Sequence, residues 1–351
     1  MVVNTAKLAN NMGAMQPSLL CYDIVERAKH FLEEPEQGIN TPFPFINTHM
    51  HGLCENDLTL IGGLSNTGKG RFLVYLLVYL ICIENKTVCF ISNEMTEADI
   101  FNAVVCSIVN MPEIQAILGN NYKLPQTNIT QGIFYDEHGV SINRDDFTST
   151  DDFEIYLNEH SPIYREFIKT LEWFDENYST KLYFVNASDD YSIERIKREV
   201  SIAQQYGCSV VAYDTLKAYR SAEWGDLAVT ATAFSECIKT SEGLHGIATF
   251  QLTDSSHNTF PEELNSNNIA ISKHIMHVAD NMLMFIELSK SIKNRYKLEN
   301  EELDVNEELP KDKTIYAFRI IKNRRGSGKD DKYAVQVDLD INRWKYVGKL
   351  I

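Results

Sequence analysis

The chain has 351 residues, of which 44% are hydrophobic, enough for a sizeable core in one large domain or two ordinary ones. Its formal net charge of −16 excludes broad, nonspecific binding of nucleic acid, so any such contact needs a local basic patch. The longest apolar run, Phe72 to Ile83, is too short to cross a bilayer. Seven cysteines without C-x-x-C spacing, and a start without a signal peptide, indicate a cytoplasmic protein with reduced thiols and no membrane segment.

The first part of the chain predicts one amphipathic helix after a flexible arm. Residues 1–16 are small and polar without periodicity. The apolar face of the helix is made by Leu20, Ile24, Ala28, Phe31 and Leu32. This face packs either on its own domain or on a neighbouring subunit, and the periodicity is compatible with both.

A short apolar strand, Leu58 to Ile61, leads into a glycine-rich loop and then an apolar helix, Phe72 to Ile83. The loop reads Gly63-x-x-x-x-Gly68-Lys69, the spacing of a P-loop, in which backbone N–H groups surround phosphates and a lysine reaches the outer ones. Gly70 follows, where serine or threonine normally gives a hydroxyl to Mg²⁺. The alternative is a glycine-rich surface turn. The predicted nucleotide-binding residues are Gly63, Ser65, Asn66, Thr67, Gly68, Lys69, Gly70 and Arg71.

The next predicted strand, Thr87 to Ile91, is apolar throughout, as in a strand buried on both faces. It is followed by Glu94, at the sheet edge where ligands gather in open α/β sheets. A glutamate there can orient and deprotonate a water aimed at a γ-phosphate. Equally, Glu94 can cap a helix that begins near Thr96.

Residues 111–180 are the least regular part, and we expect helical insertion material without a functional site. Beyond it, strand and helix patterns alternate over 182–185, 192–205, 209–214 and 227–238. Asp214 ends one of these strands, where a carboxylate can hold Mg²⁺ directly or through water. Many buried strands end in aspartate, so this assignment depends on the P-loop upstream.

Gln251 ends a further predicted strand that begins at Gly246. Its amide either senses the γ-phosphate or faces solvent from a loop. Residues 253–268 are polar and loop-like. His274 and His277 are three residues apart without a third ligand, which favours non-metal roles.

The last part of the chain predicts a hairpin, Ile315 to Ile321 and Tyr333 to Leu339, after a charged, acidic stretch over 286–310. Its turn, Lys322 to Lys329, is the one obvious basic cluster. Such a cluster is usually a solvated loop. In a strongly acidic chain, these cations can instead meet a phosphate bound by a neighbour, as arginine fingers do.

With these segments in order, the chain resembles the RecA-like domain of the DnaB-type hexameric replicative helicases. The resemblance covers roughly Asn40 to Val347, except 111–160 and 287–312. Similar segments are Phe90-Ile91-Ser92-Asn93-Glu94-Met95 to the family's strand ending in Ser-Leu-Glu-Met, Phe250-Gln251-Leu252 to its Ser-Gln-Leu, and Lys322-Asn323-Arg324 to its Lys-Gln-Arg. The resemblance implies an α/β, RecA-like P-loop NTPase fold with a mostly parallel central sheet and a C-terminal β-hairpin. It places the arm and linker helix in 1–39 and the ATPase domain in 40–351, with an insertion at about 111–160.

The resemblance also implies an ATP-dependent DNA helicase that uses ATP and Mg²⁺. Glu94 would be the catalytic glutamate, Asp214 the metal ligand and Gln251 the nucleotide sensor. Lys322 and Arg324 would reach the γ-phosphate on the next subunit. The implied partners are single-stranded DNA, further copies in a ring, which is hexameric in that family, and a primase or loader, in the cytosol of a bacterial or phage-infected cell. We expect the primase-binding amino-terminal domain of the bacterial proteins to be missing.

Gly70 departs from the family pattern, and we expect slow turnover because of it. It favours an alternative function, a nucleotide-binding assembly or scaffold protein of RecA-like fold with weak or no ATPase activity. A RecA or RadA-type recombinase is a third interpretation, disfavoured by Glu94-Met95 and by the terminal Lys-x-Arg.

Overall fold

The computed structural model describes residues 24–33, 37–217, 226–270, 274–300, 305–326, 328 and 330–351. The chain divides into two units, Met1–Gln37 and Gly38–Ile351. In the first unit, helix α2 spans Ile24–Glu33, and Ile24 and Val25 on it are exposed. The predicted arm and the first turn of the predicted helix lie outside the described residues.

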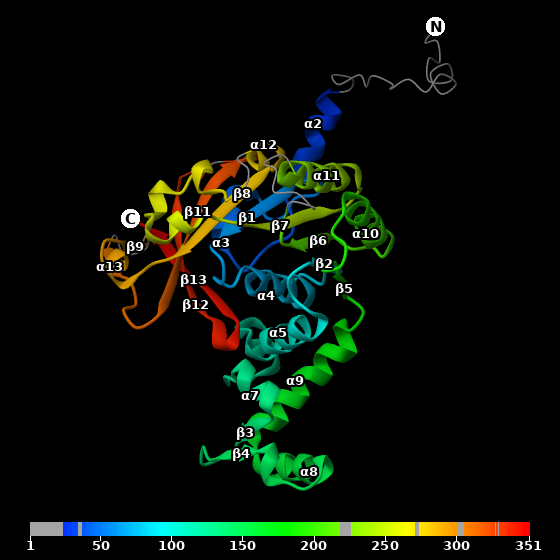
Figure 1. Ribbon diagram of the computed structural model, residues 1–351, viewed down its shortest axis with the longest axis vertical. Coiled ribbons are helices and arrows are strands. Elements are labelled where there is room, and N and C mark those ends of the chain that lie inside the picture. Colours follow the sequence, from blue (N-terminus) through cyan, green and yellow to red (C-terminus); the bar gives the residue numbers. More distant parts are fainter. Residues whose placement is uncertain are drawn as a thin grey trace. The chain divides into compact units, whose positions relative to one another are not determined.

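A mixed sheet of eleven strands runs through the second unit (Figure 1). One part is parallel, in the order β8-β1-β7-β6-β2-β5, and confirms the predicted fold class. The other part continues antiparallel from β8, in the order β11-β12-β13-β9-β10. The parallel strands are β1 (Leu58–Gly63), β2 (Val88–Ser92), β5 (Leu182–Asn186), β6 (Val210–Asp214), β7 (His245–Gln251) and β8 (Asn281–Glu287). The antiparallel strands are β9 (Lys297–Asn300), β10 (Val305–Glu308), β11 (Thr314–Asn323), β12 (Lys332–Asp338) and β13 (Arg343–Leu350).

Two hydrophobic cores cover the faces of the parallel strands, because successive side chains of a strand point to opposite faces. In β1, Ile61 belongs to one core and Leu60 to the other. The first core is covered by α3 (Pro44–Met50), α4 (Lys69–Cys82) and α5 (Glu97–Asn110), and the second by α10 (Ile193–Gln205), α11 (Asp226–Thr240) and α12 (Ile275–Val278). With both faces buried, the carboxyl edge of the parallel strands is the place for a site.

The insertion after α5 has a hydrophobic core of its own. It consists of α6 (Pro112–Leu118), α7 (Gln126–Gln131), β3 (Ile133–Tyr135), β4 (Ser141–Asn143), η1 (Arg144–Asp146), α8 (Thr150–His160) and α9 (Pro162–Tyr178). Phe134, Phe153 and Phe167 pack there against Val105 and Val109 of α5. The expectation of helical material is therefore wrong in one respect, because β3 and β4 form a short antiparallel hairpin at the end of the insertion (Figure 1).

Long-range pairing orders a stretch that the sequence left irregular. The acidic stretch after β8 contains α13 (Lys290–Lys293) and the hairpin of β9 and β10. Strand β13, which the sequence did not predict, pairs with both β12 and β9. The predicted loop over 253–268 contains only short 3-10 turns, η2 (Asp254–Asn258), η3 (Pro261–Glu263) and η4 (Ser266–Asn268).

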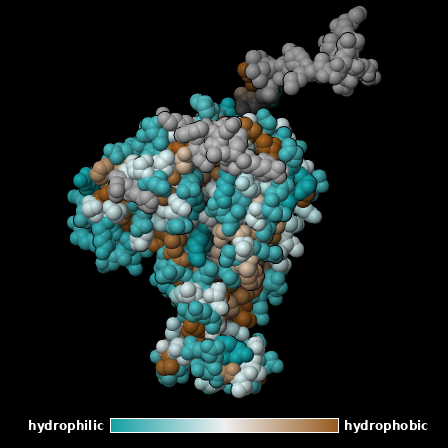
Figure 2. Space-filling view, in the orientation of Figure 1, coloured by the Kyte–Doolittle hydropathy of each residue, from teal (hydrophilic) through white to brown (hydrophobic). Residues whose placement is uncertain are grey.

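Most of the surface seen in Figure 2 is hydrophilic, and hydrophobic residues gather over α5. A cavity of about 530 Å³ lies there between α5 and the edge strand β5, lined by Phe101, Val104, Leu182 and Phe184 among others. Among the described residues no single helix is long and apolar enough to span a membrane, and α5 and α6 reach that length and composition only as a pair bent by 55°. The six described cysteines are free, and five of them are buried.

Candidate functional site

The glycine-rich loop joins the carboxyl end of β1 to the first turn of α4, so helix α4 begins at Lys69. Gly68 precedes the helix with φ of 81°, a left-handed conformation that favours glycine. The next strand, β7, runs parallel to β1 with Gln251 in register with Gly63. The loop, the helix N-terminus and Gln251 therefore meet at one edge of the sheet, as the sequence predicted for a phosphate site.

Lys69 is buried, and its ammonium points into the loop. Lys69 Nζ donates to the carbonyl oxygen of Leu64 at 2.7 Å, and Thr67 Oγ1 donates to the same oxygen at 2.8 Å. Burial lowers the pKa of Lys69, while the charges of Asp214 and Glu94 act in the opposite direction. A poorly solvated cation inside a loop of backbone N–H groups is well placed to bind an anion.

Three other predicted loop residues differ in their surroundings. Ser65 and Asn66 are exposed at the tip of the loop. The guanidinium of Arg71 donates instead to the carbonyl oxygen of Leu339 at 2.7 Å, in the turn before β13. In this structure the Arg71 side chain fastens the C-terminal strands to α4.

Asp214 lies beside the first turn of α4. It is 2% exposed, and Thr249 Oγ1 donates to its Oδ1 at 2.6 Å. Burial raises the pKa of Asp214, and the Thr249 hydrogen bond opposes that rise. A Cβ atom added to Gly70 would lie 2.7 Å from Asp214 Oδ2 and 2.8 Å from Met95 Sδ. The carboxylate therefore occupies the space that a larger residue at position 70 would need.

Oxygen donors fit Mg²⁺ at this place. The described residues contain no cluster of three or more His, Cys, Asp or Glu side chains able to hold a metal. Mg²⁺ in nucleotide sites commonly uses one or two carboxylates, with the remaining ligands supplied by phosphate oxygens and water. The single carboxylate of Asp214, next to the phosphate-binding loop, satisfies that requirement.

Glu94 follows β2 and reaches solvent. Glu94 Oε1 forms an ion pair with Lys217 Nζ at 2.9 Å, and both side chains are about two-fifths exposed. The cap of α5 is Thr96, whose hydroxyl accepts from the amide of Asp99, while the Asp99 carboxylate accepts from the amide of Thr96. The alternative in which Glu94 caps this helix is therefore wrong.

Asn93, which sequence reasoning missed, fixes the strand ends beside Glu94. Its Nδ2 donates to the carbonyl oxygen of Thr215 at 2.9 Å, and its Oδ1 accepts from the Thr215 amide at 3.2 Å. These bonds join the carboxyl ends of β2 and β6, which carry Glu94 and Asp214. The only signal was a polar residue at a strand end.

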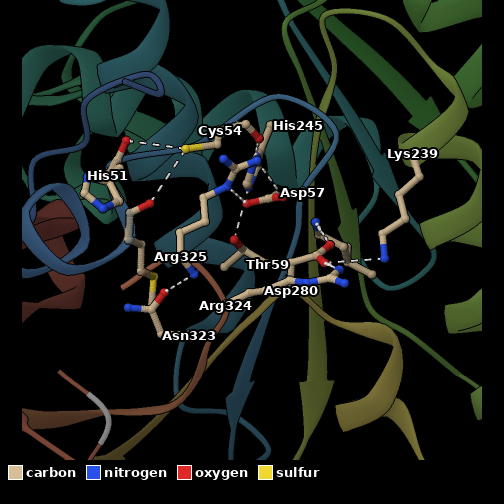
Figure 3. A network of polar contacts seen from close by, with 12 residues as sticks. His51, Cys54, Asp57, Thr59, Lys239, His245, Asp280, Asn323, Arg324 and Arg325 are labelled. Atoms are coloured by element: carbon tan, nitrogen blue, oxygen red, sulfur yellow. Dashed lines mark hydrogen bonds and ion pairs between the residues drawn. The ribbon is translucent and has the colours of Figure 1, made fainter. Parts of the chain in front are cut away.

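The predicted cations lie at the opposite edge of the sheet (Figure 3). Arg324 NH1 pairs with Asp280 Oδ1 at 2.6 Å, and Asp280 Oδ2 accepts from the amide of Leu58, the first residue of β1. Strand β1 separates this edge from the P-loop by about 17 Å, at roughly 3.3 Å per residue. Within one chain, Arg324 is therefore not brought to the P-loop.

The neighbours of Arg324 are held more firmly. Arg325 forms two hydrogen bonds to the carboxylate of Asp57, at 2.6 and 3.2 Å. Lys322 Nζ donates to the carbonyl oxygens of Met276 and Ala279 at 2.7 and 2.6 Å, at the end of α12. Of these three cations Arg324 has the side chain that reaches furthest into solvent, at 66% exposed against 30% for Arg325.

Three side chains hold the loop after Gln251. Arg319 NH1 donates to the carbonyl oxygens of Glu262 and Leu264, and Tyr296 donates to the Glu262 carboxylate. Arg319 also pairs with Asp330 in the turn of the terminal hairpin. The loop is thus attached to the strand that carries Lys322.

The fold and the P-loop at its sheet edge define the class: this is a RecA-like helicase ATPase fold. The chain is similar to a solved ATPase domain of a DnaB-like replicative helicase, with a TM-score of 0.66 and 12% identity over 95% of this chain and 100% of that chain. It is also similar to a DnaB-like replicative helicase described with its interactions with primase, with a TM-score of 0.64 and 12% identity over 98% of this chain and 71% of that chain. No protein-family model matches the sequence, and no curated protein matches it.

Proposed function

We propose that this chain is an ATP-dependent DNA helicase or translocase that works on single-stranded DNA as a ring of identical copies. One observation carries the proposal. The P-loop and the exposed Arg324 lie at opposite edges of the same sheet, so one chain holds two halves of a site that only a second copy completes. We expect a hexamer, as the resemblance implies.

In this proposal Lys69 and the loop amides bind the β- and γ-phosphates of ATP. Mg²⁺, held by Asp214 and phosphate oxygens, would neutralise charge on those phosphates. Glu94, once released from Lys217, orients and deprotonates the attacking water. Gln251, in register with Gly63, reports the γ-phosphate to the loop over 253–268, which would face DNA.

Arg324, with Lys322 beside it, would act on the ATP bound by the neighbouring copy. An arginine supplied in this way stabilises the charge of the transition state and typically contributes about 10³ to 10⁵ in rate. Because it belongs to another copy, its loss should leave binding of ATP to the P-loop largely intact.

The test is ATP hydrolysis by Arg324→Ala, measured with and without single-stranded DNA, beside nucleotide binding. Arg198→Ala is the matched control, because Arg198 is 59% exposed and pairs with a carboxylate that is 10% exposed, much as Arg324 pairs with Asp280. We expect hydrolysis to be lost only in Arg324→Ala, with binding retained in both. Equal loss of nucleotide binding in Arg324→Ala would contradict the proposal, as would a wild-type chain that stays monomeric with ATP, Mg²⁺ and DNA.

Gly70 supports a second candidate, a nucleotide-binding assembly or scaffold protein with weak or no ATPase activity. The hydroxyl usually given to Mg²⁺ is missing at this position. Wild-type chain that assembles and binds ATP but shows no DNA-stimulated hydrolysis would favour the scaffold. Stimulated hydrolysis would favour the motor, and a primase or loader could then be sought as a further partner.

A further inference from the structure

Lys239 lies beside Arg324 although the two are far apart in the sequence. Lys239 is in the last turn of α11, and Arg324 follows β11. Both head groups converge on Asp280, which precedes β8 (Figure 3). Three segments of the chain thus meet at the amino edge of the sheet.

One oxygen atom serves both cations. Asp280 Oδ1 lies 2.6 Å from Arg324 NH1 and 3.4 Å from Lys239 Nζ, while Asp280 Oδ2 accepts from the Leu58 amide at 3.0 Å. Burial alone would raise the pKa of Asp280, but the Leu58 amide, Arg324 and Lys239 outweigh burial and lower it. Asp280 is therefore a charged group that fixes where the two cations lie.

The described side chains at this edge carry an excess of positive charge. Lys239, Lys322 and Arg324 face a single carboxylate, Asp280, and three positive charges against one negative charge leave an excess of two. The neighbouring pair of Arg325 and Asp57 is neutral as a unit. In a chain of net charge −16, this local excess favours an anion.

The cations, and not the carboxylate, face solvent. The side chain of Arg324 is 66% exposed and that of Lys239 is 40% exposed, whereas that of Asp280 is 1% exposed. An approaching anion would meet the guanidinium and the ammonium first. A terminal phosphate offers three oxygens, so a planar fork and a point charge can bind it together.

We propose that Lys239 is a second catalytic cation, acting with Arg324 on the γ-phosphate held by the P-loop of the neighbouring copy. Asp280 is the positioning residue for both. This inference rests on the proposed function, because it needs a shared site, and it adds a residue that neither the motifs nor the resemblance indicated.

Lys239→Met tests the inference by removing the charge while keeping a long side chain. Lys197→Met, at an exposed lysine of the adjacent helix α10, is the matched control. We expect kcat for ATP hydrolysis to fall roughly 10- to 100-fold in Lys239→Met, the range for loss of one charge-stabilising donor. Nucleotide affinity and urea stability should stay close to wild type, and Lys239→Arg should recover part of the rate.

Mixing variants tests whether Lys239 acts between copies. In a mixture of Lys239→Met and Lys69→Ala chains, a Lys69→Ala copy can supply its Lys239 to the intact P-loop of a Lys239→Met neighbour. We expect hydrolysis above the sum of the two separate samples, and the same gain when Asp280→Asn replaces Lys239→Met. Asp280→Asn retains an oxygen for the Leu58 amide, so it removes charge without removing that bond.

The outcomes separate the inference from the proposed function. If Arg324→Ala gains activity when mixed with Lys69→Ala but Lys239→Met does not, Lys239 is no part of the shared site and the inference is overturned. A loss of stability in Lys239→Met that matches its loss of rate also overturns it. If wild type shows neither assembly nor hydrolysis, the proposed function itself fails.

Discussion

Replacing Gly70 with alanine sets two effects against each other. Gly70 is the second residue of α4, and alanine is favoured over glycine in a helix by about 1 kcal/mol. A Cβ there would, however, lie 2.7 Å from Asp214 Oδ2 and 2.8 Å from Met95 Sδ, both closer than nonbonded atoms allow. The sign of the stability change depends on whether Asp214 can move away.

The surroundings of Asp214 oppose that movement. Its carboxylate is buried and held by the hydroxyl of Thr249 at 2.6 Å. Inserting an atom into such a packed place typically costs about 1 to 3 kcal/mol. After the helix-propensity gain of about 1 kcal/mol is subtracted, we expect Gly70→Ala to lower the free energy of unfolding by up to about 2 kcal/mol.

Urea unfolding without nucleotide measures this change, and Asp214→Ala supplies the control background. With the carboxylate gone, Gly70→Ala should no longer be destabilising, so the double-mutant cycle should show an interaction between the two positions. An alanine variant about 1 kcal/mol more stable than wild type would refute the steric reasoning. Gly70→Ser, which adds a hydroxyl but displaces the carboxylate, should weaken nucleotide binding in Mg²⁺ more than in EDTA.

Three further outcomes follow from the contacts. Glu94→Gln should reduce ATP hydrolysis by about 10²- to 10⁴-fold in a turnover assay with little change in urea stability, since Glu94 is exposed, whereas Thr96→Ala should cost about 1 kcal/mol of stability through loss of the α5 cap. Arg325→Ala leaves the nearly buried carboxylate of Asp57 unpaired and should lower the free energy of unfolding by about 1 to 3 kcal/mol, and an unchanged urea midpoint would contradict this. Burial lowers the pKa of His245, so the unfolded chain binds the proton more tightly, and stability should fall as pH drops below about 6.5 by up to about 1.4 kcal/mol per pH unit, with a smaller slope in His245→Asn.

The sequence was most informative where structure depends on neighbours along the chain. The strand before Gly63 and the helix after Lys69 are local patterns, and the buried strands ending near Glu94 and Asp214 are continuous apolar runs. Parallel sheets bring such ends together at one edge. The fold class and the arrangement of the predicted P-loop residues could therefore be predicted.

Features that depend on distant pairing could not be predicted. The approach of Asp214 to Gly70 depends on how closely β6 and α4 pack, and no residue type signals a distance of 2.7 Å. Lys239 stands out from no other helix-terminal lysine until α11 is placed beside Asp280. Strand β9 is polar, so only its pairing with β13 identifies it as part of the sheet.

The separate core of the insertion has a consequence for local unfolding. Phe134, Phe153 and Phe167 meet the rest of the unit through Val105 and Val109, while Ile100 and Ile108 of the same helix pack on the sheet. Disrupting the smaller core therefore exposes little of the larger one. Regions with fewer buried apolar contacts open at lower free energy, so amide hydrogens over 124–167 should exchange with deuterium sooner than those of β1 and β7.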